Sequence, residues 1–133
     1  MITVYAREEH LSADEYIDVV AKSGLVRPIG DRARVERMLA HANLILTARQ
    51  DGKLVGFARS LTDFCFCCYL SDLAVDKACQ GQGIGKRLIE ETRTAAGGAL
   101  TTTLLLSAPT AVTFYQGIKM PQADSCFLYR RER

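Results

Sequence analysis

Three glycines at alternate positions stand between a predicted strand and a predicted helix, and this feature restricts the fold most. The segment reads Gln80-Gly81-Gln82-Gly83-Ile84-Gly85. Glycine lets a backbone turn sharply and approach a ligand closely. The first amides of the following helix have no intrahelical acceptor and lie at the positive end of the helix dipole. The segment therefore predicts a loop that holds a phosphate with its main-chain amides.

Two common phosphate-binding motifs do not fit this loop. The mononucleotide motif needs G-x-x-x-x-G-K followed by serine or threonine, but Arg87 follows Lys86, and Gln80 stands five residues before Gly85. The dinucleotide motif G-x-G-x-x-G fails because its last position falls on Lys86 or Leu88. The loop thus favours another phosphate ligand, and an unrelated phosphate-binding protein stays open as one alternative.

Composition excludes several other classes of protein. The chain has 133 residues, a net charge of +2 and 48% hydrophobic residues, which predicts one globular domain over residues 1–133. The balanced charge, without a basic run, argues against a nucleic-acid partner. No apolar run approaches the ~20 residues of a membrane helix. Acidic residues come too early for a signal peptide, and five irregularly spaced cysteines suit free thiols in the cytoplasm.

The cysteines do not form a metal-binding pattern. On a strand, Cys65 and Cys67 would face one way and Cys68 the other, so the three thiolates would not converge on one zinc ion. No second C-x-x-C occurs elsewhere in the chain. We therefore expect no metal, and we interpret these cysteines as small buried hydrophobic residues.

Capping residues, apolar spacing and turns predict a series of strands and helices. Ser12 and Glu15 form a capping box, Asp51-Gly52 marks a hairpin turn, and Pro109 suits the first turn of a short helix. An antiparallel meander that leads into a β-α-β unit predicts an α+β, or mixed α/β, domain. The predicted strands cover residues 2–5, 44–49, 54–61, 67–75, 102–106 (buried) and 127–130, and helices begin near 13, 31, 84 and 109.

Three segments together resemble the Gcn5-related N-acetyltransferases, the GNAT family. The glycine loop fits the family's Q/R-x-x-G-x-G/A motif for acetyl-CoA, residues 69–76 are similar to its fourth strand, and residues 111–115 to its A-x-x-F-Y helix. The closest likeness is to small single-domain bacterial members. The resemblance implies a central, mostly antiparallel sheet that splays between its fourth and fifth strands and is flanked by helices.

The same resemblance implies an acetyl-CoA-dependent N-acetyltransferase. Acetyl-CoA would be the co-substrate, and the acceptor would be a primary amine of a small molecule or peptide that attacks the thioester directly. The fourth strand would bond the pantetheine arm through its main chain, and the loop amides would hold the pyrophosphate. The implied cofactor-binding residues are Leu73, Ala74, Val75, Gln80, Gly81, Gln82, Gly83, Ile84, Gly85 and Lys86.

Tyr115 is the candidate general acid that protonates the leaving CoA thiolate. A phenol has a reference pKa of about 10 and a thiol of about 8.5, so the phenol is protonated at neutral pH. Asp72 is the candidate base or substrate contact, and Asp63, Arg27 and Arg32 are further candidates for the acceptor pocket. The ordinary alternatives are a core tyrosine, a strand-end carboxylate and solvated surface charges.

Two departures from the family pattern affect the end of the chain. Ala108 stands where many members carry asparagine, so an amide contact is absent or replaced by Ser107. Lys119-Met120 stands where many carry Gly-Phe. A homodimer that pairs through an exposed sheet edge would complete this region. The main functional alternative is a non-catalytic acyl-CoA-binding sensor, which needs the glycine loop but not Tyr115.

Overall fold

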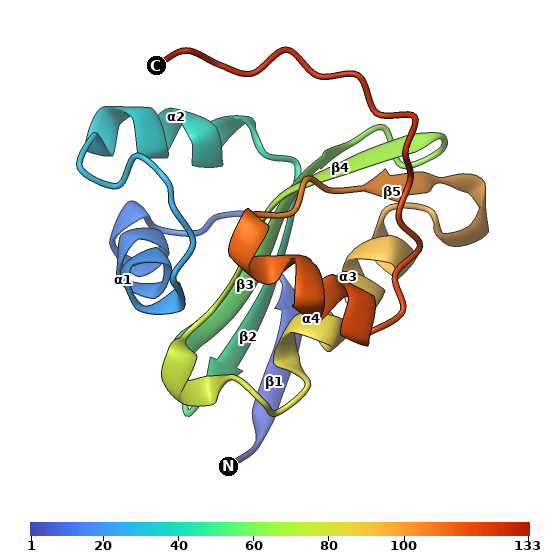
Figure 1. The fold of residues 1–133 in the computed structure, drawn as a ribbon. Helices are drawn as coiled ribbons and strands as arrows, with labels where there is room; N and C mark the ends of the chain where they lie inside the picture. The colour runs from blue at the N-terminus through green and yellow to red at the C-terminus, as the bar shows by residue number, and fades with distance from the viewer.

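The computed structural model describes residues 1–133 and contains one five-stranded sheet with helices around it (Figure 1). The sheet order is β1-β2-β3-β4-β5, in which the first four strands are antiparallel and β5 is parallel to β4. The α+β class predicted from the sequence is confirmed. The elements are β1 Thr3–Arg7, α1 Ala13–Ser23, α2 Arg32–His41, β2 Leu44–Gln50, β3 Lys53–Thr62, β4 Cys67–Val75, η1 Lys77–Cys79, α3 Ile84–Ala95, η2 Gly98–Leu100, β5 Thr102–Leu104, η3 Pro109–Ala111 and α4 Val112–Gly117.

Local sequence signals set the starts of the first two helices. Ser12 Oγ accepts the Glu15 main-chain N–H at 3.1 Å, and Asp31 Oδ1 accepts that of Arg34 at 3.1 Å. The Glu15 carboxylate does not complete the capping box at the Ser12 amide. It forms an ion pair of 2.6 Å with Arg49 instead.

The sheet separates two apolar cores. α1 and α2 pack on one face, where Tyr16 and Phe57 are fully buried, and α3 packs on the other face around Leu88. In Figure 1, α4 lies beside α3. Burial of apolar area on both faces is the main source of stability of such a sheet. No helix in the chain combines the length and apolarity that a membrane span requires.

A β-bulge in β4 reverses the direction of its side chains. Arg59 of β3 pairs with Asp72, but the next residue of β3 pairs with Leu70, so Ser71 is an extra residue in β4. Leu70 lies in the core beside α3, whereas Ala74 lies in the core beside α1. Strict alternation would put both on the same face. The bulge therefore directs the Asp72 side chain toward α1.

β4 and β5 separate after a short paired segment. Residues 67–69 of β4 pair with 102–104 of β5, and β4 then continues to Val75 without β5 beside it. The predicted splay between the fourth and fifth strands is confirmed. It leaves one main-chain edge of β4 unpaired at the end nearest the glycine loop.

Two predictions for the C-terminal part are wrong. β5 ends at Leu104 rather than at residue 106. It is not buried, because Thr102 is exposed and Leu104 is 46% exposed. Residues 127–130 form no strand, and Phe127 is 97% exposed. A strand needs a neighbour for its main-chain hydrogen bonds, and the apolar pattern of residues 127–130 does not supply one.

Two cysteines also differ from expectation. Cys68 is buried, as the sequence predicts, but Cys65 and Cys67 are exposed. Cys65 lies in the turn between β3 and β4, and Cys67 is the first residue of β4. No group of three or more His, Cys, Asp or Glu side chains is arranged to hold a metal ion.

Candidate functional site

The loop between β4 and α3 presents a row of unbonded main-chain amides. The loop is exposed from Gln80 to Gly83. Gly81 and Gly83 have φ angles of +81° and +80°, in the left-handed region that favours glycine. The main-chain bond that begins α3 runs from the Arg87 N–H to the Gly83 carbonyl at 3.0 Å. None of the amides from Gly81 to Lys86 donates to an acceptor within the chain.

Two glutamine side chains hold the loop in shape without using these amides. Gln80 Nε2 donates to the Val75 carbonyl at 3.0 Å, and Gln50 Nε2 donates to Gln82 Oε1 at 3.2 Å. Lys86 is exposed in the first turn of α3. Fixed N–H donors at the positive end of a helix suit a phosphate or diphosphate group.

The first turn of α3 is fixed by its neighbours. A Cβ at Gly85 would lie 2.9 Å from the Phe114 ring, so glycine lets α4 pack directly on α3. The Arg87 guanidinium pairs with Glu91 at 2.7 Å and lies 4.6 Å from the centre of the Tyr5 ring. Arg87 therefore stabilises the helix and its contact with β1, which leaves Lys86 as the cation beside the loop.

The end of β4 next to this loop has a free main-chain edge. The Asp76 N–H donates to the Val55 carbonyl of β3 at 2.8 Å. Because main-chain groups alternate along a strand, those of Ala74 also face β3, and those of Leu73 and Val75 face away from it. β5 does not reach this part of β4. An extended ligand can join Leu73 and the Val75 N–H as an added strand, whereas Ala74 can only border it. The Val75 carbonyl on this edge already accepts from Gln80 Nε2.

Tyr115 lies on α4 and is half-buried against the core beside α3. The Phe114 ring meets it edge-on, with 5.0 Å between the ring centres. Burial raises the pKa of the Tyr115 phenol above its usual value, and the positive charge of Arg27 lowers it in part. The net rise keeps the phenol protonated at neutral pH, as a proton donor requires.

Asp72 is the centre of a buried charge cluster on the α1 side of the sheet and is 0% exposed. Tyr16 Oη donates to Asp72 Oδ2 at 2.7 Å, Arg59 Nε to the same oxygen at 2.6 Å, and Arg27 Nε to Oδ1 at 2.6 Å. Burial would raise the pKa of Asp72, but Arg59 and Arg27 outweigh it and lower the pKa below its usual value. Such a carboxylate accepts a proton poorly at neutral pH, so the geometry favours a positioning role over a base.

Sequence reasoning misses two members of this charge cluster, Tyr16 and Arg59. The spacing at the start of α1 predicts that Tyr16 is an apolar contact, and its hydroxyl gives no sign of a partner. Arg59 carries a usable signal because it interrupts the apolar segment 54–61. Arginine is almost never fully buried unless it is paired, so a buried acid was to be expected opposite it.

Asp63 and Arg32, two further candidates for the acceptor pocket, lie outside the charge cluster. Asp63 Oδ1 accepts the amides of residues 65–67 at 2.8 to 3.0 Å, and these bonds hold its pKa well below the usual range. Arg32 pairs with Asp14 at 2.7 Å and with Glu36 at 3.1 Å on the surface. Asp63 therefore shapes a turn, and Arg32 links α1 and α2. Ser107 Oγ donates to the carbonyl of the residue that follows it.

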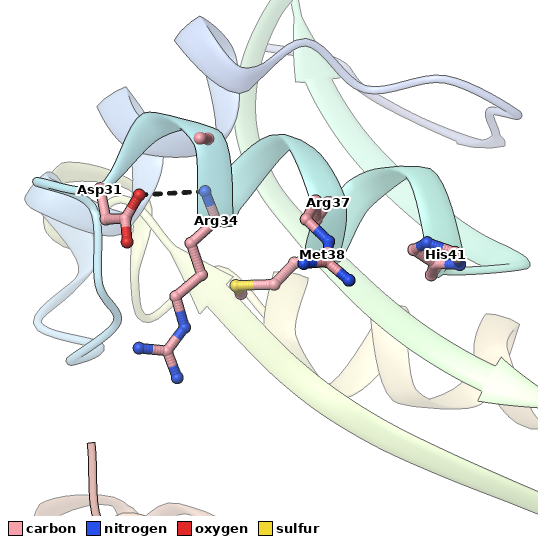
Figure 2. Close-up of a pocket in the computed structure, with 6 residues that line it drawn as sticks. Asp31, Arg34, Arg37, Met38 and His41 are labelled. Atoms are coloured by element: carbon pink, nitrogen blue, oxygen red, sulfur yellow. Dashed lines mark hydrogen bonds between the residues drawn. The ribbon is translucent and has the colours of Figure 1, made fainter.

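A pocket on the surface of α2 is separate from these groups (Figure 2). Charged side chains of α2, among them Arg34 and Arg37, line most of it, and Met38 connects it with the core beside α1. It contains no residue of the glycine loop, β4 or α4, so it is not the candidate site. The lining residues are Asp31, Ala33, Arg34, Arg37, Met38 and His41.

Comparison with known families identifies this arrangement. Residues 15–118 match the family described as the acetyltransferase (GNAT) domain. The chain belongs to the GNAT family. A curated relative, the chloroplastic GCN5-related N-acetyltransferase 2 of Arabidopsis thaliana, is 35% identical over 71 residues. The match covers 53% of this GNAT chain but only 28% of that longer protein.

Solved GNAT structures share the fold over almost the whole chain. A GNAT acetyltransferase from Streptococcus pneumoniae has a TM-score of 0.76 at 20% identity and covers 98% of this chain and 100% of its own. An aminoglycoside acetyltransferase from an uncultured soil metagenomic sample, solved with sisomicin, has a TM-score of 0.68 at 19% identity and covers 98% and 95%. The likeness at these identities establishes the fold. Acyl transfer is the general chemistry of the family whose model matches the chain.

Proposed function

We propose that this GNAT domain transfers an acetyl group from acetyl-CoA to a primary amine of a small molecule or peptide. The observation that carries the proposal is the row of unbonded amides from Gly81 to Lys86, which ends beside the free edge of β4. Coenzyme A has a pyrophosphate for the amides and a pantetheine arm for the strand edge. ATP and NAD offer phosphates but no arm of that kind.

In this proposal acetyl-CoA supplies the thioester, and the chain orients it and provides a proton. The loop amides hold the pyrophosphate, and the main chain of Leu73 and Val75 fixes the register of the arm. The amine nitrogen bonds to the carbonyl carbon while the bond from that carbon to sulfur breaks. Tyr115 donates its phenolic proton to the leaving sulfur, the nitrogen releases one proton to water as the amide forms, and water returns a proton to Tyr115.

The amine must reach the thioester without its extra proton. Asp72 is held by Tyr16, Arg27 and Arg59, so we assign it the positioning of the two arginines rather than the removal of this proton. The acceptor then enters as the free amine or gives its proton to water. The rate of acetyl transfer would rise with pH, because the fraction of the acceptor present as free amine increases.

Two measurements test the proposal. Calorimetry with CoA, ATP and NAD is expected to give clear binding of CoA only. Release of the CoA thiol is then measured with a panel of primary amines, and turnover is expected with at least one of them. CoA binding without thiol release from the whole panel would contradict transfer and favour the acyl-CoA-binding sensor.

A further inference from the structure

Arg27 is the member of the buried charge cluster that reaches solvent. It lies in the loop between α1 and α2, and its side chain is 24% exposed, compared with 8% for Arg59 and 0% for Asp72. The ion pair with Asp72 fixes the position of the guanidinium. The exposed part of Arg27 is therefore a rigid group rather than a mobile surface side chain.

Three of the five N–H groups of Arg27 are bonded within the chain. Nε donates to Asp72 Oδ1 at 2.6 Å, Nη2 to the Ser71 carbonyl at 2.7 Å, and Nη1 to the Val26 carbonyl at 2.7 Å. Nε and Nη2 share one edge of the guanidinium, and that edge faces adjacent residues of β4. Val26 precedes Arg27, and its carbonyl accepts one N–H of Nη1. Nη1 and Nη2 together form the outer edge of the guanidinium. Two N–H groups remain, one on each Nη, side by side at the outer edge.

This outer edge of Arg27 suits a planar anion. Two parallel N–H groups of a guanidinium bind a carboxylate through both of its oxygens. The charge cluster also has excess positive charge, because Arg27 and Arg59 face the single carboxylate of Asp72. Tyr16 adds a hydrogen bond but no charge.

The guanidinium of Arg27 lies where β4 leaves β5. Its partner Ser71 is the bulged residue of β4, two positions before Leu73, which borders the pantetheine arm in the proposed function. The charge of Arg27 also acts on the Tyr115 phenol, so the proton donor of the proposed function lies within its field. Arg27 is thus close to the thioester end of the site, away from the loop amides.

We propose that the acceptor carries a carboxylate and that the outer edge of Arg27 holds it through both oxygens. The substrate class is then a small amino-acid-like molecule with its amine and carboxylate on one short chain. This inference rests on the proposed acetyl transfer and names its acceptor. Arg27 acts as a specificity residue, and Asp72 positions it.

The test uses matched acceptors that differ only in the carboxylate. Glycine, β-alanine and γ-aminobutyrate are each compared with their amides, and kcat/KM is expressed per unprotonated amine for the wild-type protein, Arg27→Lys and Arg93→Lys. Lysine keeps a positive charge beside Asp72 but has no planar pair of donors. Arg93 is an exposed residue of α3 outside the site and serves as the control.

The wild-type protein is expected to prefer at least one acid over its amide by about 10- to 100-fold, the range of a charged bidentate contact. Arg27→Lys should remove the preference by raising KM for the acid, so that each acid and its amide become similar substrates. Arg93→Lys should retain the preference. Equal turnover of acids and amides by the wild-type protein would overturn the inference and leave acetyl transfer intact. CoA binding without turnover of any pair would also overturn the inference, whereas acetyl transfer itself is decided by the wider amine panel. The wild-type comparison does not depend on how Arg27→Lys folds.

Discussion

The two ends of the candidate site are built in opposite ways. The glycine loop is exposed, comes from one continuous segment, and offers main-chain amides that the chain leaves unbonded. The charge cluster around Asp72 is buried, comes from four separate elements, and uses side chains that satisfy one another. The glycine loop has free donors for a ligand. The charge cluster pairs its side chains with one another and fixes the position of one partly exposed arginine, Arg27.

This difference shows how a binding site can be assembled. A helix N-terminus with glycines before it is an anion site by local geometry alone. A buried carboxylate between two arginines depends on the whole sheet, because any missing partner leaves an unpaired charge in the core. Substitutions at the loop should therefore change binding, and substitutions in the charge cluster should change stability.

The largest expected effect is on the glycine loop. Gly83→Asp should abolish measurable CoA binding in calorimetry, because its carboxylate lies among the amides and repels the phosphates. Gly52→Asp in the hairpin between β2 and β3 is the matched control, since Gly52 also has a positive φ, of +78°, and open space around a Cβ. Normal CoA affinity in a folded Gly83→Asp protein would refute the assignment of the loop.

Next in size is the effect of breaking the charge cluster. Asp72→Asn should lower the free energy of unfolding by about 3–5 kcal/mol, because it leaves two arginines without their carboxylate. Urea denaturation at neutral pH measures this loss. Asp18→Asn removes an exposed pair with Lys22 and should change little. A loss as small as that of the control would show that the cluster does not support the fold.

The third prediction concerns Tyr115 on α4. Tyr115→Phe should lower kcat by about 10²-fold or more while KM for acetyl-CoA changes little. Because the phenol pKa is raised, wild-type kcat should fall only above about pH 10. Tyr129→Phe alters a fully exposed tyrosine and should have no effect. Unchanged turnover in Tyr115→Phe would remove its role as the acid.

The pH dependence of stability should also distinguish the charge cluster from the glycine loop, because only the cluster contains a buried carboxylate. The pKa of Asp72 is lower in the folded protein than the value of about 3.9 in the unfolded chain. Its ionised form therefore stabilises the fold fully above the unfolded value, and this contribution is lost as pH falls below that value and through the lower pKa of the folded protein. Thermal unfolding from pH 7 to pH 3 should show a smaller decrease in Tm for Asp72→Asn than for the wild type. Equal decreases would contradict the shifted pKa.

The smallest effect is expected from the C-terminal segment, which touches neither end. Deletion of residues 124–133 should change the free energy of unfolding by no more than about 0.5 kcal/mol, because Phe127 and Tyr129 are exposed and no helix or strand is lost. Size-exclusion chromatography of both proteins tests the predicted homodimer. A dimer that dissociates on deletion would show that this segment pairs with a second copy.

Much of the fold follows from signals within short segments. Ser12 and Asp31 cap their helices through their side chains, and the loop before Ile84 starts α3 where the glycines predict. The two wrong predictions concern segments whose structure depends on residues far away in the sequence. Residues 127–130 have the composition of a strand, but no neighbouring edge pairs with them. Residues 102–106 read as buried, but Thr102 and Leu104 of β5 are exposed.

The sequence by itself determined the loop, its free amides and the order of strands and helices as far as α4. Each of these depends on neighbouring residues and on the geometry of one helix turn. Only the tertiary structure decided what Asp72 does. The extra residue Ser71 turns that side chain toward α1, where Tyr16, Arg27 and Arg59 meet it from distant parts of the chain. No local pattern encodes such a meeting, because it depends on the register of two strands and on the helix packed against them.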